Sequence, residues 1–264
     1  MTDYADLLPV AHEAVDLARD IMRSMQPGVL TAKGDRDMAS EVDYAIEQRV
    51  RDLLATRTPD IGFLGEEEGA TDDDAELMWA LDPVDGTVNF IHGSPLCAVS
   101  LGLIHQKCAV VGVIDLPFLG DRYFAAEKCG AHVNGKKVSA SKTASLRDAV
   151  VAIGDYAVGA GAAEKNLPRF ALTEALASRV QRIRMHGTAA LDFAWLAAAK
   201  VDAVIMLSNK PWDTAAGVVL AREAGAVVLD SDGSDHSFES VATVACAPAL
   251  RVPLLDAMNK CLGQ

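Results

Sequence analysis

The chain contains, between residues 79 and 90, the stretch Trp79-Ala80-Leu81-Asp82-Pro83-Val84-Asp85-Gly86-Thr87-Val88-Asn89-Phe90. Its apolar beginning predicts a buried strand, which ends at Asp82. Pro83 fixes φ and tightens the turn, so that Asp82 and Asp85 face one side. Gly86 lets the backbone approach a ligand closely, and Thr87 can begin a helix whose free N–H groups face an anion. The stretch therefore predicts a combined metal and phosphate site.

Acidic residues also follow other apolar runs of the chain. Glu66 comes after the run 61–64, and Asp213 comes shortly after the run 201–207. A carboxylate at the end of a buried strand is partly desolvated and needs a counter-charge. Oxygen ligands without histidine or thiolate partners favour Mg²⁺ or Mn²⁺ over Zn²⁺. Because any one of these acids alone is more typical of a turn or a helix cap, the prediction depends on the whole set.

The composition excludes several classes of partner. The chain has 264 residues, with 24 basic and 37 acidic side chains and a formal net charge of −13. A chain this acidic repels nucleic acid and anionic membrane surfaces unless a cation intervenes. No apolar run approaches the ~18 residues of a membrane span. The five cysteines are widely spaced and include no C-x-x-C pair, which favours free thiols and, with no signal-like N-terminus, a cytoplasmic location.

The order of patterns along the chain predicts the fold class. Apolar residues recur at helical spacing over residues 4–25 and 40–55, which predicts two amphipathic helices. Short strand patterns follow, and Asn134-Gly135 predicts a type I′ hairpin turn. Beyond about residue 140 strand and helix patterns alternate. We therefore expect a mixed α/β fold of layered, α+β character.

The change of rhythm near residue 140 also predicts two halves that share a tight interface. The N-terminal half, residues 1–140, would combine helices with an antiparallel sheet and carry most of the metal ligands. The C-terminal half, residues 141–264, would be an α/β unit that supplies Asp213 and the substrate pocket.

Four segments of the chain resemble landmarks of the inositol monophosphatase family, and they occur in the family's order. They are Glu41–Glu47, Gly65–Glu67, Asp82–Phe90, and Trp212–Gly217 with the following Glu223–Gly225. The resemblance implies an α-β-α-β-α sandwich of the inositol monophosphatase and fructose-1,6-bisphosphatase type. It also implies Mg²⁺-dependent, Li⁺-sensitive hydrolysis of phosphate monoesters by a homodimer.

The same resemblance implies a role for individual residues. The implied metal ligands, for two to three Mg²⁺ ions with Mn²⁺ as an alternative, are Glu66, Asp82, the Val84 carbonyl, Asp85 and Asp213. The implied substrate contacts are Asp85, Gly86, Thr87, Thr188, Ala189 and Asp213. The implied catalytic residues are Asp43, Thr87 and Glu66, and of these Thr87 with Asp43 would orient and deprotonate the attacking water. Thr188 could instead be an ordinary helix cap without a role in substrate binding. Lys33 resembles a basic residue near the family's metals, and a simply solvated lysine is the alternative.

One departure from the family pattern bears on the substrate. In inositol-specific members a glutamate seven residues before the second-signature aspartate binds the sugar-like hydroxyls, and here that position is Met206. A thioether is a weak acceptor. Inositol 1-phosphate is the first expectation, and phosphate esters of other polyols or of amino alcohols, such as fructose 1,6-bisphosphate and histidinol phosphate, are alternatives. A scaffold or regulatory binding protein is the alternative from another class.

Overall fold

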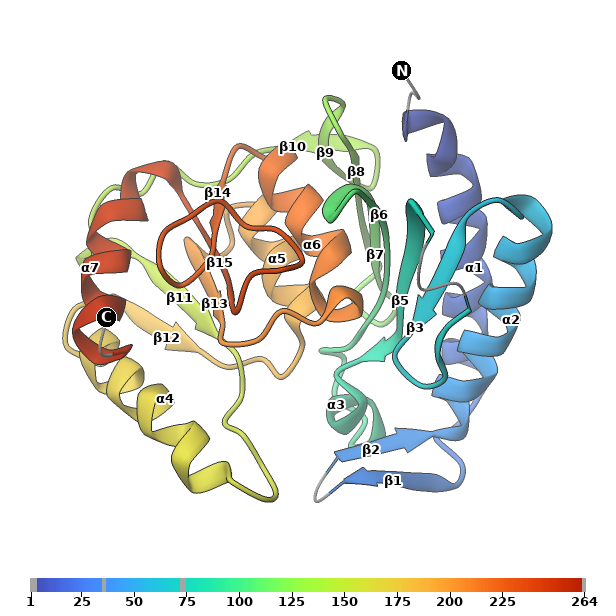
Figure 1. Cartoon of the computed structure of the whole chain (residues 1–264), viewed down its shortest axis with the longest axis horizontal. Helices are drawn as coiled ribbons and strands as arrows, with labels where there is room; N and C mark the ends of the chain where they lie inside the picture. The colour runs from blue at the N-terminus through green and yellow to red at the C-terminus, as the bar shows by residue number, and fades with distance from the viewer. Residues whose placement is uncertain (1–3, 35–36, 72–74, 263–264) are drawn as a thin grey trace.

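The protein folds into five layers, which alternate between helices and sheets (Figure 1). The structure is a computed structural model, and it describes residues 4–34, 37–71 and 75–262. In the order of the layers, α1 and α2 cover a large sheet, α5 and α6 lie between this sheet and a smaller one, and α4 and α7 cover the far side of the smaller sheet. This is the α-β-α-β-α sandwich that the resemblance implied.

The first layer contains the two helices predicted near the N-terminus. After a short 3-10 turn, α1 spans Leu8–Ser24 and α2 spans Glu41–Arg57. The side chain of Ser40 caps α2 by accepting a hydrogen bond from the backbone N–H of Val42. Between the helices lies a hairpin that the sequence pattern did not predict, formed by β1 (Leu30–Gly34) and β2 (Asp37–Ser40). Every residue of β1 is exposed, so the short alternation of apolar and polar residues along it does not mark a buried face.

The large sheet has eight strands in the order β10-β9-β8-β7-β6-β5-β3-β4. Its neighbouring strands are antiparallel, except that β3 runs parallel to β5 with Gly65 paired to Leu81. Because paired parallel strands end at the same edge, the next residues, Glu66 and Asp82, lie side by side. The strands are β3 (Gly62–Gly65), β4 (Gly69–Ala70), β5 (Leu77–Asp85), β6 (Ala98–His105), β7 (Cys108–Leu116), β8 (Asp121–Ala126), β9 (Gly130–Val133) and β10 (Lys136–Val138).

The smaller sheet has five strands in the order β12-β11-β13-β15-β14. β11 is parallel to both of its neighbours, and β15 is antiparallel to both of its own. The strands are β11 (Val150–Ile153), β12 (Arg182–Arg184), β13 (Ala203–Met206), β14 (Val227–Leu229) and β15 (Thr243–Cys246). The remaining helices are α3 (Thr87–Ile91), α4 (Ala162–Ala177), α5 (Ala189–Ala197), α6 (Pro211–Glu223) and α7 (Arg251–Leu262).

Helix α6 packs directly on the large sheet because two of its contact positions in the sheet are glycines. A Cβ atom on Gly102 of β6 would lie 2.5 Å from the Cβ of Ala215, and one on Gly112 of β7 would lie 2.6 Å from the backbone oxygen of Ala216. Any side chain at these positions would push the helix away from the sheet. Since Asp213 lies in the first turn of α6, this contact also fixes the distance of its backbone from the large sheet.

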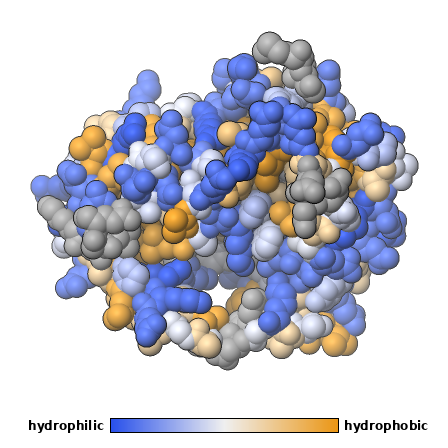
Figure 2. Space-filling model, viewed as in Figure 1, coloured by the Kyte–Doolittle hydropathy of each residue, from blue (hydrophilic) through white to orange (hydrophobic). Residues whose placement is uncertain are grey.

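In the described parts of the chain, no helix combines the length and the apolar character needed to cross a bilayer. Hydrophilic residues dominate the face shown in Figure 2. In the lower half of that face the surface is hollowed between the segments of α4 and of the β1–β2 hairpin.

Candidate functional site

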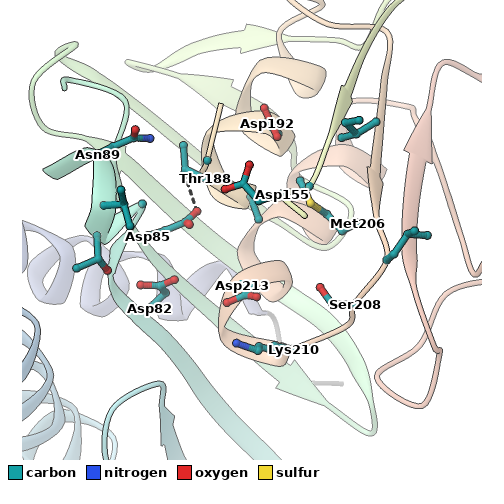
Figure 3. Close-up of a pocket in the computed structure, with 18 of the residues that line it drawn as sticks. Asp82, Asp85, Asn89, Asp155, Thr188, Asp192, Met206, Ser208, Lys210 and Asp213 are labelled. Carbon is teal, nitrogen blue, oxygen red and sulfur yellow. Dashed lines mark hydrogen bonds between the residues drawn. The ribbon is translucent and has the colours of Figure 1, made fainter. Parts of the chain in front are cut away.

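A cleft of about 460 Å³ lies where the two sheets and the helices between them meet. Residues at the carboxyl ends of β3, β5, β11 and β13 line it, together with the first turns of α5 and α6 (Figure 3). The predicted site residues that line it are Glu66, Asp82, Val84, Asp85, Gly86, Thr87, Thr188, Ala189 and Asp213. Asp43 is 1% exposed and lies behind Thr87.

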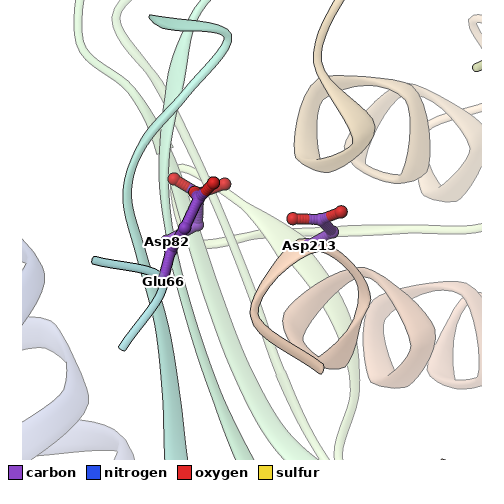
Figure 4. A group of neighbouring side chains, drawn as sticks. All are labelled: Glu66, Asp82 and Asp213. Atoms are coloured by element: carbon purple, nitrogen blue, oxygen red, sulfur yellow. The ribbon is translucent and has the colours of Figure 1, made fainter. Parts of the chain in front are cut away.

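Three carboxylates form a compact group at one end of this cleft (Figure 4). Glu66, Asp82 and Asp213 each offer an oxygen, and these oxygens lie within 4.8 Å of one another. Glu66 and Asp82 are brought together by the parallel pairing of β3 and β5, and Asp213 approaches from α6. A group of carboxylates without histidine or cysteine is a donor set for a hard divalent cation.

Asp85 lies outside this three-carboxylate group, although it lines the same cleft. Its Oδ2 accepts hydrogen bonds from Thr188 Oγ1 at 2.7 Å and from the backbone N–H of Ala190 at 2.5 Å. Thr188 is also the N-cap of α5, where its hydroxyl accepts from the backbone N–H of Leu191. Asp85 therefore anchors the first turn of α5 to the end of β5.

The turn after Asp85 requires a glycine. Gly86 has φ = 88°, and a Cβ there would lie 3.1 Å from the Leu96 carbonyl oxygen and 3.2 Å from the Gly187 carbonyl oxygen. Helix α3 begins at the next residue, as the sequence predicts.

Thr87 and Asp43, predicted to act together, are in contact. Thr87 Oγ1 lies 3.3 Å from Asp43 Oδ1 and 3.1 Å from the Val84 carbonyl oxygen, so its single hydrogen can be donated to either. The other oxygen of Asp43 accepts from the backbone N–H and the hydroxyl of Ser40. Asp43 thus closes the capping box of α2 and contacts the cleft through Thr87.

The electrostatics of the cleft show an excess of negative charge. Burial, and then the neighbouring carboxylates of Glu66, Asp85 and Asp213, raise the pKa of Asp82 well above its usual range. Burial, and then Asp213, raise the pKa of Asp85 to about 8, although Thr188 and Ala190 donate to it. Shifts in this direction mean that each carboxylate resists ionisation until a cation is present.

Lys33 is a basic side chain that contacts this cluster. Its Nζ lies 2.8 Å from Glu66 Oε1 and 3.0 Å from Glu67 Oε1. Burial alone would lower the pKa of Lys33, but the hydrogen bonds and charges of the two glutamates raise it above its usual range. The lysine is therefore paired with the cluster rather than simply solvated.

Glu47 is a residue of the site that the sequence reasoning missed. Its buried carboxylate accepts from Arg51 Nη2 at 2.6 Å and from the backbone N–H groups of Glu67 and Glu68, both at 2.9 Å. A Cβ on Gly65 would lie 2.1 Å from the Glu47 carboxyl carbon, so the turn that carries Glu66 wraps around this group. Glu47 lies one turn after Asp43 on the buried face of α2. An acidic residue on the apolar face of a predicted helix is unusual, and this pattern in the sequence could have indicated a role for Glu47.

Asn89 is a second missed residue, and it connects segments far apart in the sequence. Its Nδ2 donates to the carbonyl oxygens of Leu96 and His186, both at 2.7 Å. His186 comes just before Gly187 and Thr188, so Asn89 holds this wall of the cleft against α3 (Figure 3). An asparagine one turn after Asp85-Gly86 was visible in the sequence, but its partners were not.

Comparison with known proteins identifies the family. The sequence model of the inositol monophosphatase family matches residues 3–261. The chain belongs to the inositol monophosphatase family. Members of this family are metal-dependent phosphatases that hydrolyse phosphate monoesters. The family and the fold expected from the sequence motifs are therefore confirmed, whereas the role of each residue stays a prediction.

Individual relatives cover most of the chain. The inositol-1-monophosphatase ImpA of Mycolicibacterium smegmatis is 35% identical over 224 residues, which are 85% of this chain and 81% of that protein. The fructose-1,6-bisphosphatase/inositol-1-monophosphatase of Thermotoga maritima is 32% identical over 202 residues, 76% of this chain and 75% of that protein. The crystal structure of the extragenic suppressor protein suhB from Bartonella henselae is 31% identical, with a TM-score of 0.89, and covers 97% of this chain and 99% of that one.

The contacts of Glu47 lead to a first prediction. In Glu47→Gln the amide keeps one acceptor oxygen but turns an NH₂ group toward donors, so the turn carrying Glu66 shifts. Because partners behind a metal ligand commonly change affinity 10–100-fold, the Mg²⁺ concentration that gives half-maximal thermal stabilisation should rise about tenfold. Glu164→Gln, at an exposed residue of α4, is the matched control. An unchanged Mg²⁺ dependence in Glu47→Gln would show that this contact does not position Glu66.

The raised pKa values lead to a second prediction. Without metal, a folded-state pKa of about 8 at Asp85 stabilises the fold through protonation, and this contribution is lost as the pH rises through 8. A cation has to displace that proton, so its affinity falls below this pH. Thermal unfolding should therefore show a larger Mg²⁺-induced rise in midpoint at about pH 8.5 than at about pH 6. Equal shifts at both pH values would contradict the charge balance described for the cleft.

Proposed function

We propose that this chain is a Mg²⁺-dependent phosphatase of small phosphate monoesters, with inositol 1-phosphate as the first candidate substrate. The observation that carries the proposal is the group of three carboxylates, Glu66, Asp82 and Asp213, in a cleft that also offers backbone and hydroxyl donors. A dianionic phosphate cannot approach such a group without a cation. Phosphoryl transfer needs mainly positioning and charge neutralisation, which a cleft of this kind can supply.

The donor set fits Mg²⁺, and Mn²⁺ has similar preferences. We assign Glu66, Asp82, the Val84 carbonyl, Asp85 and Asp213 as the groups that hold two to three such ions. The Asp85 oxygen bonded to Thr188 and Ala190 keeps that carboxylate in a fixed orientation. When bound, Mg²⁺ lowers the pKa of water and neutralises charge on the transferring phosphoryl group.

The residues after β5 are assigned to the phosphate. Without a Cβ, Gly86 leaves the backbone accessible beside Asp85 and Thr87, and all three line the cleft. Thr188 and Ala189 reach the cleft from the first turn of α5. These groups would place the phosphorus between the carboxylates and α5.

The attacking water is assigned to Thr87, Asp43 and Glu66. Thr87 Oγ1 can accept a proton from the water while it donates its own to Asp43 Oδ1, 3.3 Å away. Burial raises the pKa of Asp43, which makes its carboxylate a better proton acceptor than an exposed aspartate. Glu66 lines the cleft on the same side, where it would help to orient the water.

The names of relatives guide the choice of alcohol. ImpA of M. smegmatis is named as an inositol-1-monophosphatase, and the T. maritima relative also as a fructose-1,6-bisphosphatase. Fructose 1,6-bisphosphate is therefore the second candidate substrate. Histidinol phosphate remains a candidate because Met206 lines the cleft without a polar group to bind a polyol.

The proposal includes a homodimer, which the family resemblance supports, and a cytoplasmic location, which the cysteine usage supports. Light scattering at several protein concentrations measures the mass of the particle in solution and so tests the dimer.

Phosphate release from inositol 1-phosphate tests the proposed activity. Release should require Mg²⁺, stop with a chelator and be reduced by Li⁺. Asp85→Asn should lower kcat/KM by at least about a hundredfold, because it removes a charge that the metals need. The carboxamide oxygen can still accept from Thr188 and Ala190, so the thermal unfolding midpoint without metal should not fall. Asp60→Asn, at an exposed residue outside the cleft, is the matched control.

Failure to release phosphate from inositol 1-phosphate, fructose 1,6-bisphosphate and histidinol phosphate, with Mg²⁺ or Mn²⁺ present, would contradict the proposed function. A scaffold protein gives a different result. It would bind a partner in stoichiometric amount, and Asp85→Asn would leave that complex intact.

A further inference from the structure

Asp155 lies at the edge of the smaller sheet that faces the cleft, next to Met206. Strands β11 and β13 are parallel, with Ile153 paired to Ile205, so Gly154 and Met206 follow side by side. The backbone N–H of Gly154 donates to the Ile205 carbonyl oxygen at 3.0 Å, which continues the pairing beyond β11. A Cβ on Gly154 would lie 3.0 Å from Met206 Sδ. Asp155 is therefore fixed one residue beyond the methionine that forms the neighbouring wall.

The carboxylate of Asp155 points into the cleft between Thr188 and Met206 (Figure 3). On its other side it approaches the loop held by Asn89, since a Cβ on Gly187 would lie 3.6 Å from Asp155 Oδ2. Within the described residues, no hydrogen bond or ion pair of this carboxylate is found. Partial desolvation raises the pKa of Asp155 above its usual range.

The basic side chains that line the cleft are engaged elsewhere. Lys33 is paired with Glu66 and Glu67. Arg169 donates to the carbonyl oxygens of Lys165 and Leu207. Lys210 lies over the Trp212 ring, at 5.6 Å from its centroid, and Figure 3 places it beside Asp213.

The position of Asp155 determines which part of a substrate it can meet. The three-carboxylate group and Thr87 occupy the end of the cleft assigned to phosphate. Asp155 and Met206 line the part formed by the smaller sheet, which is left for the alcohol. Of these two neighbours, Met206 offers a weak thioether acceptor and Asp155 a carboxylate that can accept several hydrogen bonds.

We propose that Asp155 is the specificity-determining residue of this cleft: its carboxylate accepts hydrogen bonds from donor groups on the leaving alcohol. This inference rests on the proposed phosphatase function. The donors can be the hydroxyls of a polyol or the ammonium of an amino alcohol, and an alcohol without donors would leave the Asp155 carboxylate unpaired. Asp155 is exposed to solvent in the open cleft. A bound alcohol would cover its carboxylate, and a polar group that is covered without gaining a hydrogen-bond partner is costly, so such a site discriminates between alcohols.

Two matched pairs of esters test this role. Inositol 1-phosphate and cyclohexyl phosphate differ in the ring hydroxyls, and 2-aminoethyl phosphate and ethyl phosphate differ in one ammonium group. For each pair we define the preference as kcat/KM of the donor-bearing ester divided by that of the donor-free ester. In Asp155→Ala the preference should fall at least about tenfold in one pair, because losing a hydrogen bond to a charged group has an effect of this size. The fall should come mainly from a higher KM for the donor-bearing ester.

The variants separate the two sources of donor. If hydroxyls are recognised, Asp155→Asn keeps part of the preference for inositol 1-phosphate, because the amide oxygen still accepts. If an ammonium is recognised, Asp155→Asn loses the preference for 2-aminoethyl phosphate as fully as Asp155→Ala does. Asp60→Ala removes an exposed carboxylate outside the cleft and should change neither preference.

Two outcomes overturn the inference while leaving the proposed function in place. Both preferences could stay within about twofold of the wild type in Asp155→Ala. Alternatively, Asp155→Ala could lower kcat/KM by the same factor for all four esters and also raise the Mg²⁺ concentration that the enzyme requires. That result would make Asp155 part of the metal site. If the wild type with Mg²⁺ hydrolyses none of the four esters and neither fructose 1,6-bisphosphate nor histidinol phosphate, the proposed function itself fails.

Discussion

Carboxylates that lie close together in a partly desolvated cleft repel one another, and much of the structure around the cleft holds Glu66, Asp82 and Asp213 together against that repulsion. The parallel pairing of β3 with β5 sets Glu66 beside Asp82. Direct packing of α6 on the glycines of β6 and β7 fixes the approach of Asp213. The cost of assembling these charges appears in the raised pKa values of the site, and a divalent cation is the group that would remove it.

The supports behind the cluster come from different layers. Glu47, on the buried face of α2, holds the turn that carries Glu66. Asp85 and Asn89 join the end of β5 and α3 to the segment that begins α5. Because these contacts connect the large sheet to the layer between the sheets, a shift of either side would open the cleft. Asp85 and Asn89 belong to the predicted half 1–140, and their partners belong to the predicted half 141–264. The site therefore depends on contacts between these two halves.

The net charge of −13, together with the carboxylates of the cleft, determines how a phosphate can approach this protein. It excludes direct attraction of phosphate to the surface, and the cleft adds further negative charge where a phosphate would bind. Phosphate should therefore reach this protein only through bound metal.

Local patterns in the sequence predicted much of the site but little of what supports it. The turn at Gly86 and the start of α3 at Thr87 could be predicted because glycine and proline have strong local preferences, but β5 did not end at Asp82 as predicted: it continues through an irregularity in its pairing to Asp85. The β1–β2 hairpin could not, since its first strand is exposed throughout. β15 and α7 were also not predicted, because their positions depend on packing against distant strands and helices. The contacts of Glu47 and the unpaired carboxylate of Asp155 depend on tertiary structure, so one sequence could not show them.

Calorimetric titration with inorganic phosphate tests the central claim most directly, because it needs no knowledge of the alcohol. In the presence of a chelator the account predicts no measurable heat of binding. With Mg²⁺ at saturating concentration it predicts binding of one phosphate per chain, which is lost in Asp82→Asn. Equal phosphate affinity with the chelator and with Mg²⁺ would contradict the claim that the carboxylate cluster meets phosphate only through a divalent cation.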